Sequence, residues 1–157
     1  MRFLYAIAAL LVSQTSLFGA TTATPTITYT IGSIDAISVS GNPGPLNVTT
    51  ATAGSAPTNA TDATTTYNVT TNNTARKITG ALATNMPSGV TLTVNLAAPT
   101  GATSAGAVNM STVAASLVTG IANLNQSSLT ITYTLSATAA AAQVAAATNT
   151  LTYTIGP

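Results

Sequence analysis

The sequence predicts an all-β fold in which antiparallel strands form a sandwich or a barrel. Three observations support this prediction. Apolar and polar residues alternate with a period of two in many short segments, as in strands with one buried face. Clusters of Gly, Pro, Asn and Ser separate these segments about every 10 to 15 residues, which favours antiparallel strands over parallel α/β units. The exposed face is rich in Thr, a β-branched residue that suits a pleated surface.

The first twenty residues, MRFLYAIAALLVSQTSLFGA, have the features of a secretory signal peptide. Arg2 supplies a positive charge, residues 3–12 form an apolar run, and a small residue ends the segment at Ala20. The run is too short to span a bilayer, which needs about 20 apolar residues. Cleavage after Ala20 or after Ala23 fits the sequence. We therefore expect residues 21–157 to be one β domain, secreted through the periplasm to the medium or the cell surface, with no membrane insertion.

Four segments alternate strongly enough to be predicted as strands: 26–31, 90–96, 129–135 and 151–155. Each places aliphatic or tyrosine side chains on one face and mostly Thr on the other. The first and the last belong to nearly identical sequences, TITYTIG and TLTYTIG, so the same type of strand is expected near both ends of the mature chain. Their inward residues are the candidates for strand assembly: Ile27, Tyr29, Ile31, Leu151, Tyr153 and Ile155.

Five further segments alternate over shorter lengths and complete the expected strands. They are 37–39, 46–48, 67–69, 78–82 and 116–121. Turn residues separate the strands at 41–45, 53–57, 71–73, 86–89 and 98–106. The Ala-rich segment 136–148 is the one stretch with real helix propensity. Because strands flank it, we expect a long connection there that includes one helical turn at most.

The predicted strand at 26–31 changes phase where it meets the next segment. Its inward residues share a face with Ile37 and Val39, but Ser33 and Asp35 fall on that face between them. The stretch GSIDA must therefore bend, bulge or change partner. Residues 21–33 are accordingly predicted to be a separable N-terminal strand.

Few charged side chains remain once the signal peptide is removed: Asp35, Asp62, Arg76 and Lys77, with a formal net charge of zero. Two adjacent cations cannot neutralise a nucleic-acid backbone or hold an anionic membrane surface, so we expect no nucleic-acid partner. Asp62 in TNATDATT is predicted to be a turn residue that bonds its own backbone. Arg76 and Lys77, after TNNTA, are predicted to lie in a solvated turn.

The chain contains no His, no Cys and no Glu. General acid-base catalysis, nucleophilic catalysis and transition-metal binding draw mainly on these residues. We therefore expect no enzymatic activity, no cofactor and no bound metal. The absence of Cys also means that packing and backbone hydrogen bonds must supply the stability of the exported domain.

Several stretches resemble a group of small, uncharacterised secreted bacterial β-sandwich proteins: ISVSGNPGPLNV, AGSAPT, MPSGVTLTVNLAAPTGATSAG, LTITYTLSAT and TLTYTIG. They cover most of the mature chain and imply bacterial export and a β domain. More loosely, the overall plan resembles fimbrial subunits of the chaperone-usher and spore coat protein U type, with a Thr-rich sandwich and a final strand that carries Tyr153. That resemblance implies an immunoglobulin-like β-sandwich of about 7 to 9 strands. No functional residue is carried over beyond the strand segments.

Two functions from different classes follow from these features. The leading hypothesis is an extracellular, fimbrial-like structural subunit that self-associates through edge strands, with residues 23–31 completing the sheet of a neighbour. The alternative is a monomeric secreted adhesin or carbohydrate-binding module, which would need exposed aromatic rings in loops. The periodicity leaves open whether the two terminal strands pair within one molecule or between molecules, and leaves any small-molecule ligand unidentified.

Overall fold

The computed structural model describes residues 22–157. The predicted signal peptide lies outside the described residues. The chain divides into two units, Met1–Ile31 and Gly32–Pro157. In the described part of the first unit, residues 22–31 form neither strand nor helix. We call residues 22–31 the N-terminal segment and Gly32–Pro157 the β unit.

The β unit contains only strands and connections, which confirms the predicted all-β class. Its ten strands exceed the number expected, because three short strands form where no strand was predicted, at 60–62, 103–104 and 108–109. The described residues contain no helix with the length and apolar character that a membrane crossing requires. The strands are β1 Asp35–Val39, β2 Ala60–Asp62, β3 Thr66–Thr71, β4 Arg76–Leu82, β5 Val90–Leu96, β6 Thr103–Ser104, β7 Val108–Asn109, β8 Ala115–Ile121, β9 Leu124–Ala137 and β10 Leu151–Gly156.

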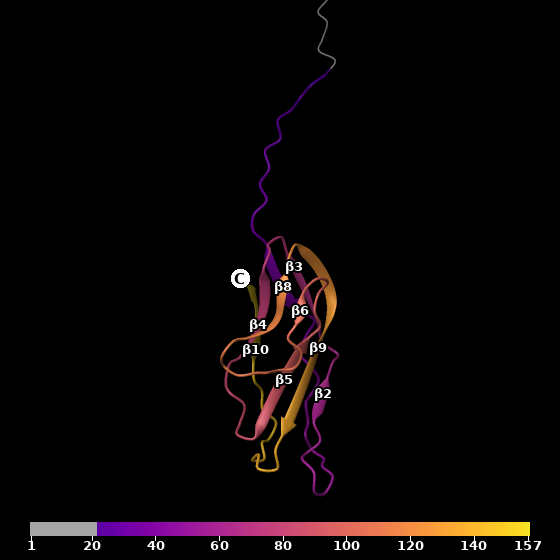
Figure 1. Cartoon of the computed structure of the whole chain (residues 1–157), viewed down its shortest axis with the longest axis vertical. Coiled ribbons are helices and arrows are strands. Elements are labelled where there is room, and N and C mark those ends of the chain that lie inside the picture. The colour runs from indigo at the N-terminus through magenta and orange to yellow at the C-terminus, as the bar shows by residue number, and fades with distance from the viewer. Residues whose placement is uncertain (1–21) are drawn as a thin grey trace, which may run out of the picture. The chain divides into compact units, whose positions relative to one another are not determined.

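Two antiparallel sheets are formed by these strands. The six-stranded sheet has the order β1-β3-β9-β5-β7, with β2 paired to β9, and the four-stranded sheet has the order β10-β4-β8-β6. Figure 1 shows β10 running beside β4, and β5 running beside the long β9. The edge strands are therefore β1, β2 and β7 in one sheet and β10 and β6 in the other. The edges β1 and β10 lie close to each other.

One hydrophobic core joins the two sheets, in the manner of a β-sandwich. The period-two pattern explains its composition, because alternate residues of each strand point inward. In β4, for example, Ile78, Gly80 and Leu82 are buried while the residues between them are half-buried. The buried core residues from both sheets are Tyr67, Val69, Ile78, Leu82, Val94, Leu96, Met110, Leu117, Val118, Ile121, Ile131 and Tyr133.

The strongest alternating segments of the β unit form the predicted strands, but one weaker prediction was wrong. The segment 46–48 forms no strand, although Leu46 still packs against the core. The Ala-rich stretch forms the expected long connection, since β9 extends to Ala137 and residues 138–150 are irregular, without a helical turn. Alanine supplies helix propensity, but Val144, the one large apolar side chain in the stretch, is exposed and does not hold a helix against the sheets.

The prediction of a solvated turn at Arg76 and Lys77 was also wrong. Both residues begin β4, where Arg76 pairs across the sheet with Ile121 and Lys77 with Gly156. The turn lies just before them, at residues 72–75. Asp62 ends strand β2 and does not lie in a turn, but it makes the predicted local bond: its carboxylate accepts a hydrogen bond from the backbone N–H of Thr64 at 3.2 Å.

Candidate functional site

The N-terminal segment carries three large apolar side chains that are almost fully exposed. Ile27 is 79% exposed, Tyr29 81% and Ile31 77%. The strand that was predicted at 26–31 is not formed. Single exposed apolar residues are ordinary, but three at alternate positions define one continuous apolar face when the backbone is extended.

The matching residues at the other end of the chain are packed. Leu151, Tyr153 and Ile155 are half-buried and lie against the core from β10. Tyr153 pairs directly with Gly80 of β4. A Cβ atom on Gly80 would lie 2.9 Å from Cδ1 of Leu117, so a side chain at that position has no room. The structure thus places half of the predicted candidates in a sheet and leaves the other half exposed.

One edge of β10 has no strand partner among the described residues. Its other edge is fully paired with β4 over six residues. No charged residue lies in β10, whereas charges are a common protection of sheet edges against further pairing. The free edge of β10, opposite β4, therefore pairs with no strand in residues 22–157, although β1 lies close to it.

A groove of about 890 Å³ opens beside β10. It is bounded by the end of β1, by the segment 41–46, by the connections 84–87 and 147–150, and by β10 itself. None of the residues that line it carries a charge. We call it the β10 groove. Its apolar lining includes Leu46, Leu82, Leu92, Tyr133, Leu135 and Tyr153.

Two tyrosine hydroxyls link the two sheets within the β10 groove. Tyr153 of β10 donates a hydrogen bond through Oη to Oη of Tyr133 of β9 at 3.1 Å. Burial raises the pKa of both phenols above the ordinary value. Both groups are therefore neutral at physiological pH, and the groove holds polar hydroxyls without charge.

The rim of the β10 groove is held by an amide side chain. Asn149 donates through Nδ2 to the carbonyl oxygen of Thr84 at 2.7 Å, and its Oδ1 accepts from the backbone N–H of Thr84 at 3.3 Å. This pair of bonds ties the irregular connection before β10 to the end of β4. The rim is consequently fixed although it contains no regular secondary structure.

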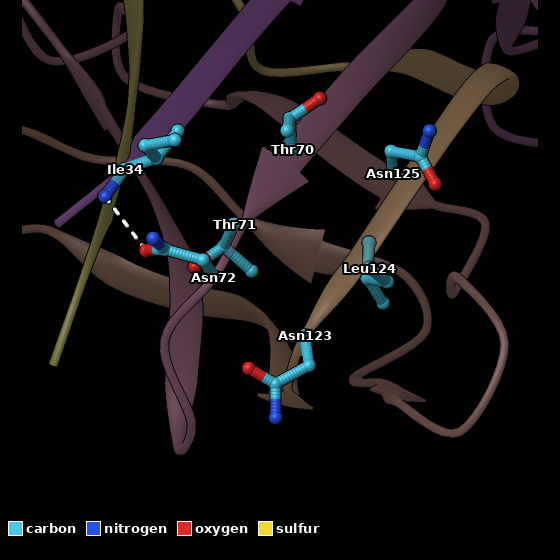
Figure 2. A pocket seen from close by; sticks show the side chains of 7 residues that line it. All are labelled: Ile34, Thr70, Thr71, Asn72, Asn123, Leu124 and Asn125. Carbon is cyan, nitrogen blue, oxygen red and sulfur yellow. Dashed lines mark hydrogen bonds between the residues drawn. The ribbon is translucent and has the colours of Figure 1, made fainter. Parts of the chain in front are cut away.

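A smaller pocket of about 390 Å³ lies where β1 begins. Its lining combines Ile34 and the end of β3 with Asn123, Leu124 and Asn125, as Figure 2 shows. The backbone N–H of Ile34 donates to Oδ1 of Asn72 at 2.8 Å. The same amide donates through Nδ2 to the carbonyl oxygen of Gly32 at 2.8 Å. The side chain of Asn72 therefore fixes the backbone immediately after the N-terminal segment.

Two of the four charged side chains of the β unit, Asp35 and Arg76, pair next to this pocket. Thr71 donates to the Asp35 carboxylate at 2.6 Å, Asn73 donates to it at 3.1 Å, and Arg76 forms an ion pair with it at 3.0 Å. The hydrogen bond from Thr71, followed by those from Asn73 and the charge of Arg76, lowers the pKa of Asp35. The carboxylate is thus saturated by structural contacts that hold β1 against the β3–β4 turn.

The sequence predicted only some of the residues that line the two cavities. Tyr133 and Leu135 were predicted to face inward, but nothing in the local pattern shows that the sandwich is open beside them. Leu46 was predicted to lie in a strand and Met86 in a turn. The only sign that either side chain lines a cavity is that it is a large apolar residue next to turn residues. The role of Asn72 was missed because TNN is indistinguishable from an ordinary turn. Within residues 22–157, no group of three or more His, Cys, Asp or Glu is placed to hold a metal ion.

Comparison with protein-family models, curated proteins and solved structures finds no match to this chain.

Proposed function

We propose that the chain is a secreted structural subunit with an immunoglobulin-like β-sandwich and no catalytic activity, and that it assembles by β-strand addition. The single observation that carries this proposal is the exposed apolar face of Ile27, Tyr29 and Ile31. An alternating segment with this composition gains backbone hydrogen bonds and apolar burial when it joins a sheet. Assembly would supply both.

The contact is head-to-tail, because the segment that is donated and the sheet edge that receives it belong to different parts of the chain. A contact of this kind does not close on itself unless the rotation between subunits permits a ring, so it generates fibres. The low charge of the chain, with four charged side chains after residue 20, supports close packing of identical subunits. The assembly is proposed to form outside the cell, at its surface or in the medium.

The chemistry of the described residues supports a role without catalysis. The carboxylate of Asp35 is saturated by Thr71, Asn73 and Arg76, and that of Asp62 accepts from Thr64. Neither carboxylate lines the β10 groove. The titratable groups that line the groove are the phenols of Tyr133 and Tyr153, and burial raises the pKa of both, so neither is activated as a nucleophile. The partner that we propose is instead a second copy of this chain.

The test compares residues 21–157 with residues 32–157 by electron microscopy and sedimentation velocity. We expect fibres or long oligomers from the longer protein and a folded monomer from the shorter one. The shorter protein keeps the bonds from Asn72 to Gly32 and Ile34, so circular dichroism should show an unchanged β fold. A stable monomer of 21–157 at high concentration, or equal assembly of both proteins, would contradict the proposal.

A further inference from the structure

We propose that the β10 groove of a second copy is the acceptor for residues 26–31, which add as a new strand to the free edge of β10. This inference rests on the proposed function, and it adds the identity of the receiving surface. It follows from a comparison of the sheet edges, from the sequence of the donated segment and from the chemistry of the groove.

The edges of the two sheets differ in their capacity to accept a six-residue strand. The edge strands β6 and β7 have two residues each and the edge strand β2 has three, too few to pair with such a segment along its length. The edge strand β1 has five residues, and it begins with Asp35, whose carboxylate is bound to Arg76. The edge strand β10 has six residues and no charge. Length and neutrality both favour β10.

The donated segment is nearly a copy of the strand that it would join. TITYTIG at 26–32 and TLTYTIG at 150–156 differ at one position, Ile27 against Leu151. Neighbouring strands present side chains on the same face in register. When Thr28 and Thr30 continue the outer face of Thr152 and Thr154, the alternate residues Ile27, Tyr29 and Ile31 point toward the core. They then lie over the β10 groove.

The groove matches this face chemically. Neither residues 22–31 nor the residues that line the groove include a charged side chain, so docking pairs two uncharged surfaces. The carboxylate of Asp62 lies beside Gly44 at the border of the groove. Leu46, Leu92 and Leu135 supply apolar contacts for the isoleucines. A buried tyrosine hydroxyl normally needs a hydrogen-bond partner. The hydroxyls of Tyr133 and Tyr153 lie in the groove and offer one to Tyr29.

Addition to β10 is favoured over replacement of β10. Replacement beside β4 would expel Leu151, Tyr153 and Ile155 and bury nearly the same side chains in their place, so little apolar area would be gained. The intramolecular strand also has the higher effective concentration. Addition leaves β10 in its pairing with β4 and covers surface that is otherwise open.

Disulfide mapping tests the acceptor directly, because the chain contains no cysteine of its own. Two singly substituted proteins, each comprising residues 21–157, are mixed in equal amounts and oxidised. The donor carries Thr28→Cys. The acceptor carries Thr152→Cys or Thr154→Cys, both on the exposed face of β10. Matched acceptors on other edges carry Ser38→Cys on β1, Thr103→Cys on β6 or Asn109→Cys on β7, and all three positions are exposed.

We expect the disulfide-linked heterodimer with at least one β10 position to be about tenfold more abundant than with any of the other edges, because a disulfide needs Cα atoms within about 7 Å. Equal or stronger linkage to β1, β6 or β7 would overturn the acceptor assignment and leave the proposed function standing. If the unsubstituted protein sediments as oligomers but no β10 position cross-links, the acceptor assignment is likewise overturned and the proposed function stands. Unsubstituted protein that stays monomeric would overturn the proposed function together with this inference.

Discussion

Replacing Ile27, Tyr29 and Ile31 together by serine is expected to convert the assembled protein into a monomer. Burial of each of these side chains at an interface is worth about 1.5–3 kcal/mol. Loss of all three removes about 4.5–9 kcal/mol, and each 1.4 kcal/mol corresponds to a tenfold change in the dissociation constant. We therefore expect assembly to weaken by at least about a thousandfold, measured by sedimentation velocity over a concentration series. The β unit should keep its unfolding midpoint, because these side chains are exposed in the single chain.

The matched control changes the opposite face of the same segment. Thr26→Ala, Thr28→Ala and Thr30→Ala keep the apolar face and should leave assembly within about tenfold of the unsubstituted protein. If the serine variant assembles as well as the alanine variant, the apolar face is not what holds subunits together. If both variants are monomeric, the outward threonines contribute to assembly as well, and the apolar face alone does not account for it.

Alkaline pH is expected to destabilise the β unit through its buried tyrosines. Burial raises the pKa of Tyr67 to about 12, and it also raises the pKa of Tyr133 and of Tyr153. An unfolded tyrosine titrates near pH 10, so above that pH the unfolded state releases protons that the folded state retains. The contribution of Tyr67 is complete below pH 10 and is lost as the pH rises to about 12, at about 1.4 kcal/mol per pH unit. Urea unfolding between pH 8 and pH 12 measures this slope.

Tyr67→Phe is the control for the alkaline slope. Tyr67 is 1% exposed, and its hydroxyl donates to the carbonyl oxygen of Ala97 at 2.6 Å. The variant loses this bond and should be about 1 kcal/mol less stable at pH 8. It also lacks the titrating group, so its free energy of unfolding should fall less steeply above pH 10. A slope equal to that of the unsubstituted protein would show that other groups control alkaline unfolding.

The sequence was sufficient to predict the fold class because one physical signal dominates it. Alternation at 90–96 and 151–155 reflects a buried face against a Thr-rich one, and both segments form strands. Stability depends on that burial, so the sequence alternates wherever a strand packs one face on the core. The same reasoning failed at 46–48, where Leu46 contacts the core from an irregular segment, because burial of one side chain does not require a strand.

The site could not be predicted to the same extent, because it depends on contacts between distant residues. The groove exists because β1 and β10 are both edge strands and leave the side between them open, and strand order is not encoded in local periodicity. The ion pair of Asp35 with Arg76 and the amide bonds of Asn72 likewise join residues about 40 positions apart. Arg76 was predicted to be a turn residue because it follows the turn-like sequence TNNTA, and local sequence does not reveal its distant partner Asp35.

The two matched segments show most clearly that local alternation does not determine whether a segment is paired in a sheet. TITYTIG and TLTYTIG carry the same alternation, yet residues 151–156 are paired with β4 and residues 26–31 are in no strand. Local preference is the same at both ends, so tertiary context alone decides the outcome. The proposed partner of residues 26–31, which have strong strand character and form no strand in their own chain, is a sheet edge of another molecule.

Amide hydrogen exchange of residues 26–31 measures that pairing directly. We predict that these amides exchange without protection in dilute protein and become protected as the concentration is raised into the range where oligomers form. Protection that is the same at every concentration would mean that the segment pairs within its own molecule and is not donated to a neighbour. Amides that stay unprotected in fully assembled protein would equally contradict strand addition between molecules.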